Sequence, residues 1–406
     1  MKLRSLAFLF LAICTNILQL EAAQPDQVIE FFRHGARAPL SNYDPQWSSS
    51  ELAQLTTVGM VEHYYLGKTI AEKYPDLVAS GYDPDDVYVL SSAAKRCINS
   101  AMVHVSSMFR GLTSTLATSS PEGLQDTLIS EYTPLLPTDE ADRGDYVPVK
   151  VNVVVSGTDD YLIFNGRDPT WCPNLATYRN QNMASSEMSQ GWTAFQIPVQ
   201  EANSYLTGSQ IITSMPILCN AYDAFIADEY DGKTLPGGIT DDDLIESLNY
   251  GQAYYQYILE QRQSIQKGLT SFNTFKAITD QLANFRQGNN AKKLVLLSGH
   301  DLNIYAVLSA LGVISADCLL ANYEDHVNNQ SLSSPSCQFP HFASNLIVEF
   351  YNDTSSPSVK VYYNDAIIPL CNGQDSCSYG DFMTLVQTAG GSDGSLNTWN
   401  KNCGSN

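Results

Sequence analysis

The sequence predicts an α/β fold in which a mostly parallel central sheet is flanked by helices and bears a mainly helical cap insertion. Short apolar, β-prone segments alternate with helix-period segments at both ends of the chain, which is typical of strands joined by crossover helices. The middle third lacks this alternation, and no internal repeat, low-complexity tract or long Pro/Gly linker interrupts the chain. We therefore expect an α/β core built from residues 24–120 and 270–406, and a mainly helical cap formed by residues 121–269.

The N-terminal part of the core is expected to contain two strands, each followed by a helix. The second of these helices is supported by a set of apolar residues that keep to one face at helical period: Ala94, Ile98, Ala101, Val105 and Met108. In chain order we expect a strand at 28–32, a long loop, a helix at about 57–74, a strand at 87–90 and a helix at about 93–109.

Further periodic segments occupy the cap and the C-terminal part of the core. One clear helix falls in the cap, near 241–266. After it we expect a helix at 271–287, a strand at 294–297, a helix at 303–311, strands at 346–351 and 359–363, and a last helix near 379–388.

Residues 1–23 have the layout of a secretory signal peptide. Lys2 and Arg4 precede an apolar stretch at 6–18, and the small residues Ala22 and Ala23 follow it. No second run of about 18 apolar residues and no lipid-anchor signal is present. We therefore expect no membrane anchor and a soluble product in a lumen or outside the cell.

Cysteine usage fits an oxidising compartment. Nine cysteines become eight when Cys14 leaves with the signal peptide, and an even set in a secreted chain indicates disulfides. Structural zinc is the alternative, but no CxxC pair exists and the six histidines are scattered without metal-ligand spacing. The sequons at Asn329 and Asn352 are candidate glycosylation sites on the same route.

The chain is strongly acidic, with 22 Lys and Arg residues against 43 Asp and Glu residues and a formal net charge of −21. Such a field repels nucleic acid and anionic membranes, so neither is an expected partner. Solubility in an acidic compartment is the simplest interpretation of this charge. Because basic residues are scarce, arginines that converge on one point are conspicuous.

Chemically active side chains follow three of the expected strands. The strand at 28–32 leads directly into the run Arg33-His34-Gly35-Ala36-Arg37-Ala38-Pro39. Arg96 lies in the first turn of the helix after the strand at 87–90, and His300-Asp301 closely follows the strand at 294–297. Ligands of open α/β sheets bind beyond the carboxyl ends of the strands. We therefore expect the three groups to meet in one site.

Each of these groups also has a purely structural interpretation. Arg96 alone could be a solvated residue at a helix start, and His300-Asp301 alone could cap a helix through the aspartate. Caps do not require all three groups at one sheet edge, so their joint occurrence favours a site. The string Gly390-Gly391-Ser392-Asp393-Gly394 matches the serine-hydrolase pattern GxSxG, but it follows a helix instead of a strand, and we expect it to terminate that helix.

Phosphoryl chemistry asks for these residue types. A phosphomonoester must be attacked at phosphorus while its charged oxygens are held and its leaving oxygen is protonated. Arginines bind phosphate oxygens with planar, permanently charged donors. A histidine ring nitrogen is a competent nucleophile, and a carboxylic acid within hydrogen-bond reach can serve as general acid and later as base. No metal or other cofactor is needed when guanidinium groups neutralise the phosphate.

On these residues the chain resembles the histidine acid phosphatases of the lysosomal and prostatic type, within the wider histidine phosphatase superfamily. The family signature RHGxRxP corresponds to residues 33–39, and its HD dyad corresponds to His300-Asp301. The stretch at 55–64, LTTVGMVEHY, is similar to the family's LTxxGxxQH. The resemblance covers nearly the whole mature chain and is strongest at its two ends.

The resemblance implies a role for each matching residue. His34 would be the nucleophile that forms a phosphohistidine, and Asp301 would donate the proton to the leaving group. Arg33, Arg37 and His300 would cradle the phosphoryl group. The protein is then expected to hydrolyse small phosphate monoesters, with an acidic optimum because Asp301 must be protonated and its reference pKa is about 3.9.

The fourth phosphate ligand lies in a stretch that departs from the family pattern. The family has RSTDxxRT where this chain reads LSSAAKRC at 90–97. Arg96 falls on the required position, but Leu90 replaces the leading arginine and Ala93 replaces the aspartate. We retain Arg96 as a substrate ligand and expect Ser92 to replace the lost polar contact at the helix start.

Other properties follow from the same resemblance. Family-like disulfides would join Cys172 with Cys403, Cys219 with Cys337 and Cys371 with Cys377, which leaves Cys97 and Cys318 unexplained. The family also favours a homodimer, secreted or in the lysosomal lumen.

Three other functions remain as alternatives. A secreted phosphoryl- or sugar-binding protein could keep the pocket and have lost catalysis through the altered stretch near Ala93, although binding alone would not require His34 and Asp301. The same fold supports phytate hydrolysis, against which the net charge of −21 is a mild argument. Mutases of the wider superfamily share the RHG triplet, but a secreted chain with disulfides and an HD dyad fits them badly.

Overall fold

A computed structural model describes residues 24–109, 149–289, 291–389 and 396–404. The expected signal peptide, the string at 390–394 and the expected core–cap junction at 120/121 lie outside these described residues.

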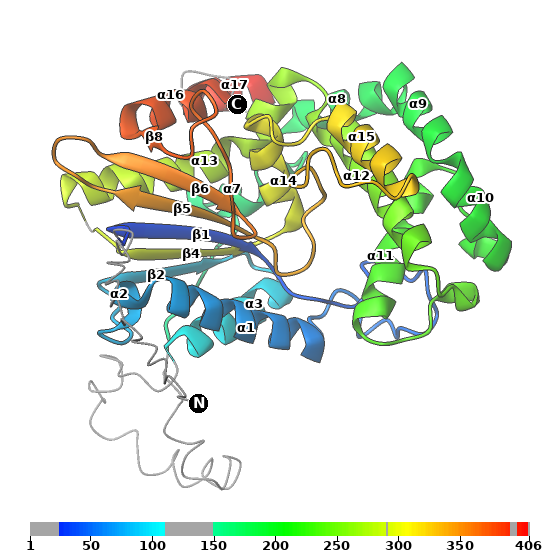
Figure 1. The fold of residues 1–406 in the computed structure, drawn as a ribbon, viewed down its shortest axis with the longest axis horizontal. Helices are drawn as coiled ribbons and strands as arrows, with labels where there is room; N and C mark the ends of the chain where they lie inside the picture. The colour runs from blue at the N-terminus through cyan, green and yellow to red at the C-terminus, as the bar shows by residue number, and fades with distance from the viewer. Residues whose placement is uncertain (1–23, 110–148, 290, 390–395, 405–406) are drawn as a thin grey trace, which may run out of the picture.

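A mixed sheet forms the centre of the fold (Figure 1). Within the described residues it has eight strands in the order β3-β2-β4-β1-β5-β6-β7, with β8 paired to β6. The core of the sheet is parallel, as expected, and consists of β1 (Gln27–Arg33), β2 (Val87–Ser91), β3 (Asn152–Val153) and β4 (Leu294–Gly299). Antiparallel pairing extends it through β5 (Asn345–Tyr351), β6 (Ser358–Tyr363), β7 (Ala366–Ile367) and β8 (Cys377–Ser378).

Helices cover both faces of the sheet, as Figure 1 shows. The side chains of β1 alternate between two apolar clusters, Val28 and Phe32 in one and Ile29 and Phe31 in the other, which explains why the strand reads as a continuous apolar run. One face is covered by α1 (Thr57–Lys73), α2 (Pro75–Val78) and α3 (Lys95–Met108), and the other by α13 (Ser264–Gln287), α14 (Asp301–Ala310) and α16 (Tyr379–Ala389).

A mainly helical cap lies at the end of the sheet where β1 and β4 finish (Figure 1). The buried helix α12 (Asp242–Gln261) packs against several of its other helices. These are α8 (Pro173–Met183), α9 (Ser186–Ala194), α10 (Gln196–Tyr205) and α11 (Met215–Tyr230). Helix α7 (Asp159–Asn165) precedes them in the chain and packs against α13 of the core. A short 3-10 turn at Gly208–Gln210 lies between α10 and α11, and another at Pro236–Gly238 lies between α11 and α12.

The structure differs from the expected elements at several places. The short strands β3, β7 and β8 and helix α2 were not expected, and β3 lies in the expected cap segment but pairs with β2 in the sheet. The helix expected at 241–266 ends earlier, as α12, and its last residues belong to α13. The new helix starts after Gln263, whose amide donates to the side chain of Gln266 and whose carbonyl oxygen accepts from the amide of Gln266. Helix α15 (Ala316–Val327) belongs to the C-terminal segment but packs on α12. Helix α17 (Leu396–Cys403) was not expected and packs against α8 and α13.

No helix among the described residues combines the length and the apolar character that crossing a membrane requires.

Candidate active site

Strand register brings the predicted groups together. In the parallel pair of β1 and β4, Arg33 lies opposite Gly299, so both strands end at the same level. On the other side of β4, Ser91 of β2 lies opposite Ser298. The three strand ends are therefore neighbours, as the sequence predicts, and the residues that follow them share one site.

Arg33 is almost fully buried and is held in place by three contacts. Its Nη2 lies 2.9 Å from Oδ2 of Asp301, and its Nη1 donates to the carbonyl oxygen of Pro340 at 2.6 Å. The guanidinium carbon sits 4.3 Å from the centre of the Phe342 ring, where a cation is attracted to the ring face. Pro340 and Phe342 precede β5 and were not expected to contribute.

His34 is held in one tautomer. The side chain is 2 % exposed, and Nδ1 lies 2.9 Å from the carbonyl oxygen of Gly35, which can only accept a hydrogen bond. Nδ1 therefore carries the proton. Burial and then the charges of Arg33, Arg37 and Arg96 hold the pKa of His34 well below 6.5, so the ring is neutral and Nε2 keeps its lone pair.

The second motif, at 55–64, supports the loop that carries His34. A Cβ on Gly35 would overlap the backbone of Gly59 on α1, so both positions require glycine. Glu62 accepts a hydrogen bond from the amide of Ala36 at 2.6 Å, and Nε2 of His63 donates to the carbonyl oxygen of Arg33 at 3.1 Å. This helix therefore fixes the backbone on both sides of His34.

Arg37 is anchored by the cap. Its Nη2 lies 2.7 Å from Oδ1 of Asp223 on α11, while Oδ2 of Asp223 accepts from the amide of Leu40 at 2.7 Å. Sequence reasoning missed Asp223 because nothing local marks an aspartate on a cap helix as the partner of an arginine far away in the chain.

His300 bridges Ser92 and Arg96. Its Nε2 lies 3.0 Å from Oγ of Ser92, and its Nδ1 lies 3.5 Å from Nη2 of Arg96. An arginine only donates, so Nδ1 accepts and Nε2 donates to Ser92. Burial, Arg96 and Arg167 lower the pKa of His300 to about 3. Ser92 also accepts from the amide of Ala94 at 3.2 Å and so makes a polar contact at the start of α3.

Asp301 is ionised in this arrangement. Burial alone would raise its pKa, but the charges of Arg33 and Arg37 outweigh burial and hold the pKa below its ordinary value. The rings of His300 and His34 lie edge to face with 5.8 Å between their centres, so the dyad and the expected nucleophile are neighbours.

A further arginine from the cap acts on the site. Arg167, between α7 and α8, interacts electrostatically with His300 and Asp301. Sequence reasoning missed it, because it follows no strand of the core. A buried Nε atom without a hydrogen-bond partner occurs in Arg33, Arg37, Arg96 and Arg167. Unpaired buried donors are costly, and an anion that accepts several hydrogen bonds can satisfy such donors.

Part of this site lines a cavity of about 220 Å³, to which Arg33, Arg37, Asp223, Asp301 and Phe342 contribute. His34, His300, Arg96 and Arg167 are not among its lining residues. Within the described part of the chain, no group of three or more His, Cys, Asp or Glu side chains is arranged to hold a metal ion.

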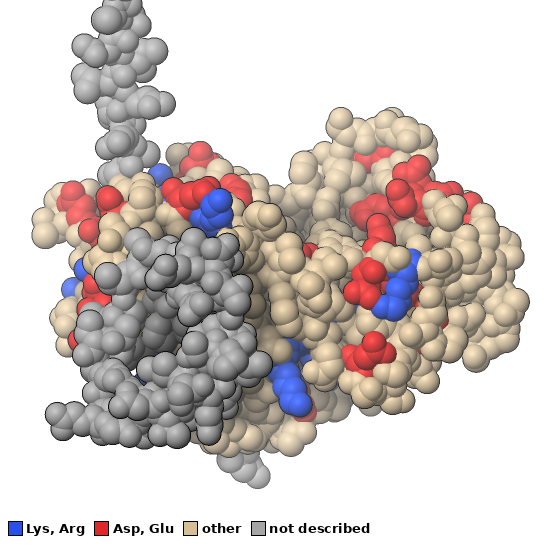
Figure 2. All heavy atoms as spheres, turned by 90° about the horizontal axis from the view of Figure 1, so that it is seen from below, with Lys and Arg blue, Asp and Glu red and all other residues tan. Residues whose placement is uncertain are grey.

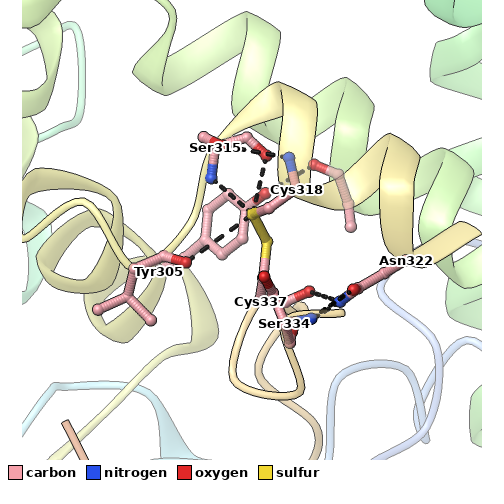
Figure 3. The surroundings of a disulfide bond; sticks show 8 residues. Tyr305, Ser315, Cys318, Asn322, Ser334 and Cys337 are labelled. Atoms are coloured by element: carbon pink, nitrogen blue, oxygen red, sulfur yellow. Dashed lines mark hydrogen bonds between the residues drawn. A yellow bond between two sulfur atoms is a disulfide. The ribbon is translucent and has the colours of Figure 1, made fainter. Parts of the chain in front are cut away.

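Disulfides follow the expectation in two pairs and depart from it in the third. Cys172 joins Cys403, and Cys371 joins Cys377. The expected link between Cys219 and Cys337 was wrong, because Cys337 joins Cys318 instead (Figure 3).

The physical reason for this pairing is the short connection after α15. Cys318 lies in the first turn of α15, and the side-chain amide of Asn322 on the same helix donates to the carbonyl oxygens of Ser334 and Cys337, which folds the following loop back against the helix (Figure 3). Cys219 instead lies on α11, where Gln256 donates to its sulfur at 3.1 Å. Cys97 is free and buried, with its sulfur 3.8 Å from Nδ1 of His300.

The fold and this site define a phosphoryl-handling α/β protein built around a histidine in a ring of arginines. The model of the histidine phosphatase superfamily (branch 2) matches residues 26–364, and the chain belongs to that family.

Relatives in sequence include acid phosphatases. The chain is 24% identical over 373 residues to the prostatic acid phosphatase of Bos taurus, covering 87% of this chain and 82% of that protein. It is 22% identical over 372 residues to the lysosomal acid phosphatase of Homo sapiens, covering 88% and 76%.

Solved structures share the fold. The phytase of Citrobacter braakii superposes with a TM-score of 0.61 at 14% identity, covering 90% of this chain and 98% of that one. The phytase of D. castellii superposes with a TM-score of 0.59 at 15% identity, covering 94% and 82%.

Proposed function

We propose that the protein is an acid phosphatase that hydrolyses phosphate monoesters through a phosphohistidine at His34, without a metal ion. Membership of the histidine phosphatase superfamily and the names of its relatives support this class of phosphoric monoester hydrolase. The observation that carries it is the neutral His34 ring, fixed in one tautomer by Gly35 and surrounded by buried guanidinium groups.

The first step transfers the phosphoryl group. Arg33, Arg37 and Arg96 bind its oxygens and stabilise the charge that spreads over them in the transition state, with His300 beside them. The Nε2 lone pair of His34 attacks phosphorus, the bond to the leaving oxygen breaks, and Asp301 protonates that oxygen. In the second step water attacks the phosphohistidine while Asp301 takes up its proton, which releases phosphate and restores the free enzyme.

Substrate binding resolves the conflict between an ionised Asp301 and its role as an acid. Arg33 holds the pKa of Asp301 low when no anion is bound. A bound phosphate adds negative charge beside the same arginines, which raises the pKa of Asp301 and favours its protonated form. An acidic medium favours this form further, which gives an acidic optimum.

Processing and assembly complete the proposal. We propose removal of residues 1–23, glycosylation at Asn329 and Asn352, and a homodimer that acts outside the cell or in the lysosomal lumen. Asn329 is exposed and Asn352 is partly exposed at the turn after β5. The division into a core of 24–120 and 270–406 and a cap of 121–269 also stays a proposal. The grouping of α8–α12 supports it, although α15 packs on that cap and β3, at 152–153, pairs in the core sheet. The mass and hydrodynamic size of the purified protein test these points.

The activity itself is tested by hydrolysis of an aryl phosphate from pH 3 to 8, with and without a chelator, for the wild type and His34→Ala. We expect acidic activity that a chelator leaves intact and that His34→Ala abolishes without unfolding the protein. Loss of activity on chelation contradicts the metal-free mechanism, and full activity of His34→Ala contradicts the role of His34.

A further inference from the structure

The charges around His34 suit an anionic group. Arg33, Arg37 and Arg96 act on His34, and Arg167 acts on Asp301. Carboxylates interact with the same arginines: Asp301, Asp223 and Glu62 with Arg33, and Glu260 with Arg167. The guanidinium groups nearest His34 are the donors that a phosphoryl group bound there would meet.

The described residues that line the cavity offer no further lysine or arginine to a second phosphate. Among the described residues that line it, Arg33 and Arg37 are the only lysine or arginine side chains, and both are committed to the phosphoryl group. Apart from Asp223, Asp301 and His341, the remaining wall consists of side chains without charge, such as Leu40, Ile226 and Gln256. The described surface in Figure 2 consists mostly of other residues, with scattered acidic patches and fewer basic ones.

Asp223 places a fixed negative charge in this wall. Its two oxygens are held by Arg37 and by the amide of Leu40, each at 2.7 Å, so the carboxylate cannot turn away. The side chain remains 20% exposed and lines the cavity. A phosphate on the leaving group would therefore meet a like charge that it cannot displace, and like charges held close together cost binding free energy.

We propose that Asp223 is a specificity-determining residue that restricts the enzyme to small esters carrying a single phosphate and disfavours polyphosphorylated substrates such as inositol hexakisphosphate. The size of the cavity points the same way, since about 220 Å³ lies below the roughly 300–1,000 Å³ typical of sites for drug-sized ligands. The proposal deepens the proposed function and rests on it. The fold that this chain shares with solved phytases does not decide between monophosphate and polyphosphate substrates, because a fold alone does not select the leaving group.

The test compares kcat/KM for glycerol 2-phosphate and for inositol hexakisphosphate in the wild type and in Asp223→Asn. We expect the wild type to prefer the monophosphate by at least about tenfold, and Asp223→Asn to move the ratio toward the hexakisphosphate by about fivefold or more. The asparagine keeps an acceptor for the amide of Leu40 but removes the charge and the ion pair with Arg37. Disturbing Arg37 affects both esters alike, so a merely structural role of Asp223 leaves the ratio unchanged.

A second variant works without touching Arg37. Asn220 is exposed on α11 and lines the cavity, so Asn220→Lys adds the missing positive charge and should move the ratio in the same direction. Matched controls on exposed cap positions outside the cavity lining are Asn180→Lys on α8 and Glu201→Gln on α10, which should leave the ratio unchanged.

Each outcome decides the matter. A ratio that moves in the active cavity variants but not in the controls supports the inference, and Asn220→Lys alone decides if Asp223→Asn does not fold. Turnover of both esters with an unmoved ratio overturns the inference and leaves the phosphatase function standing. Absence of turnover on every monoester overturns the proposed function, and the inference falls with it.

Discussion

Replacing Asp301 by asparagine separates the charge of this side chain from its shape. The asparagine retains an oxygen for the amide of Leu302, which lies 2.7 Å from Oδ1, and Arg33 keeps its hydrogen bond to the carbonyl oxygen of Pro340. The ion pair between Arg33 and Asp301 at 2.9 Å is lost, and so is the proton donor. The variant should therefore fold but act differently on different esters.

Two effects of opposite sign follow from this change. General acid catalysis contributes about 10²–10⁴ in rate, so esters of alkyl alcohols, which need protonation, should slow by that factor. Esters with good leaving groups, such as p-nitrophenyl phosphate, should slow by less than about tenfold. Phosphate should bind more tightly, because a negative charge about 4 Å away is worth up to about 4 kcal/mol at an effective dielectric constant of 20. Removal of even a third of this repulsion, about 1.3 kcal/mol, makes phosphate bind about tenfold more tightly as an inhibitor.

The assay measures kcat on glycerol 2-phosphate and p-nitrophenyl phosphate, together with the inhibition constant of inorganic phosphate, for the wild type and Asp301→Asn. Equal losses on both esters, or weaker inhibition by phosphate, would refute the assignment of Asp301 as proton donor at the anion site. A purely structural role would weaken catalysis and phosphate binding together.

Three further outcomes are expected. Arg96→Ala should lower kcat/KM for p-nitrophenyl phosphate by about 10²-fold, whereas the matched change Lys95→Ala at its exposed neighbour should have little effect; similar rates for the two variants would remove Arg96 from the site. Burial and the surrounding arginines hold the pKa of His34 well below 6.5, so His34 stays unprotonated as the pH falls through 6.5. We therefore expect kcat/KM to show no loss on acidification through this pH, and a decline centred at pH 6.5 would mean that the pKa of His34 is not lowered. Peptide mapping without reduction should recover Cys318 linked to Cys337, and breaking this link by Cys318→Ser should lower the free energy of unfolding by about 3 kcal/mol; a peptide that links Cys337 to any other cysteine contradicts the structure.

The sequence predicted the part of the site that lies on the core. Arg33, His34 and His300 follow strands that are neighbours in the sheet, and the rule that ligands bind at the carboxyl ends of parallel strands was sufficient to place them together. The departure of the stretch at 90–97 from the family pattern could also be interpreted locally, since Ser92 contacts both His300 and the start of α3.

The contributions of the cap could not be predicted in this way. Asp223 and Arg167 reach the site through the packing of cap helices on the sheet edge, and no local pattern records that packing. The pairing of Cys318 with Cys337 was missed because α15 itself was missed. Ser315, whose hydroxyl accepts from the amide of Cys318, is the capping signal that could have marked the start of that helix.

The central claim is that one imidazole carries the phosphoryl group during turnover. Rapid quenching into denaturant at alkaline pH during hydrolysis of p-nitrophenyl phosphate, followed by peptide mass spectrometry, measures this directly. We expect a single phosphorylated peptide with the phosphoryl group on His34, and none in His34→Ala. A phosphoryl group on another residue, or undiminished turnover by His34→Ala, would contradict it.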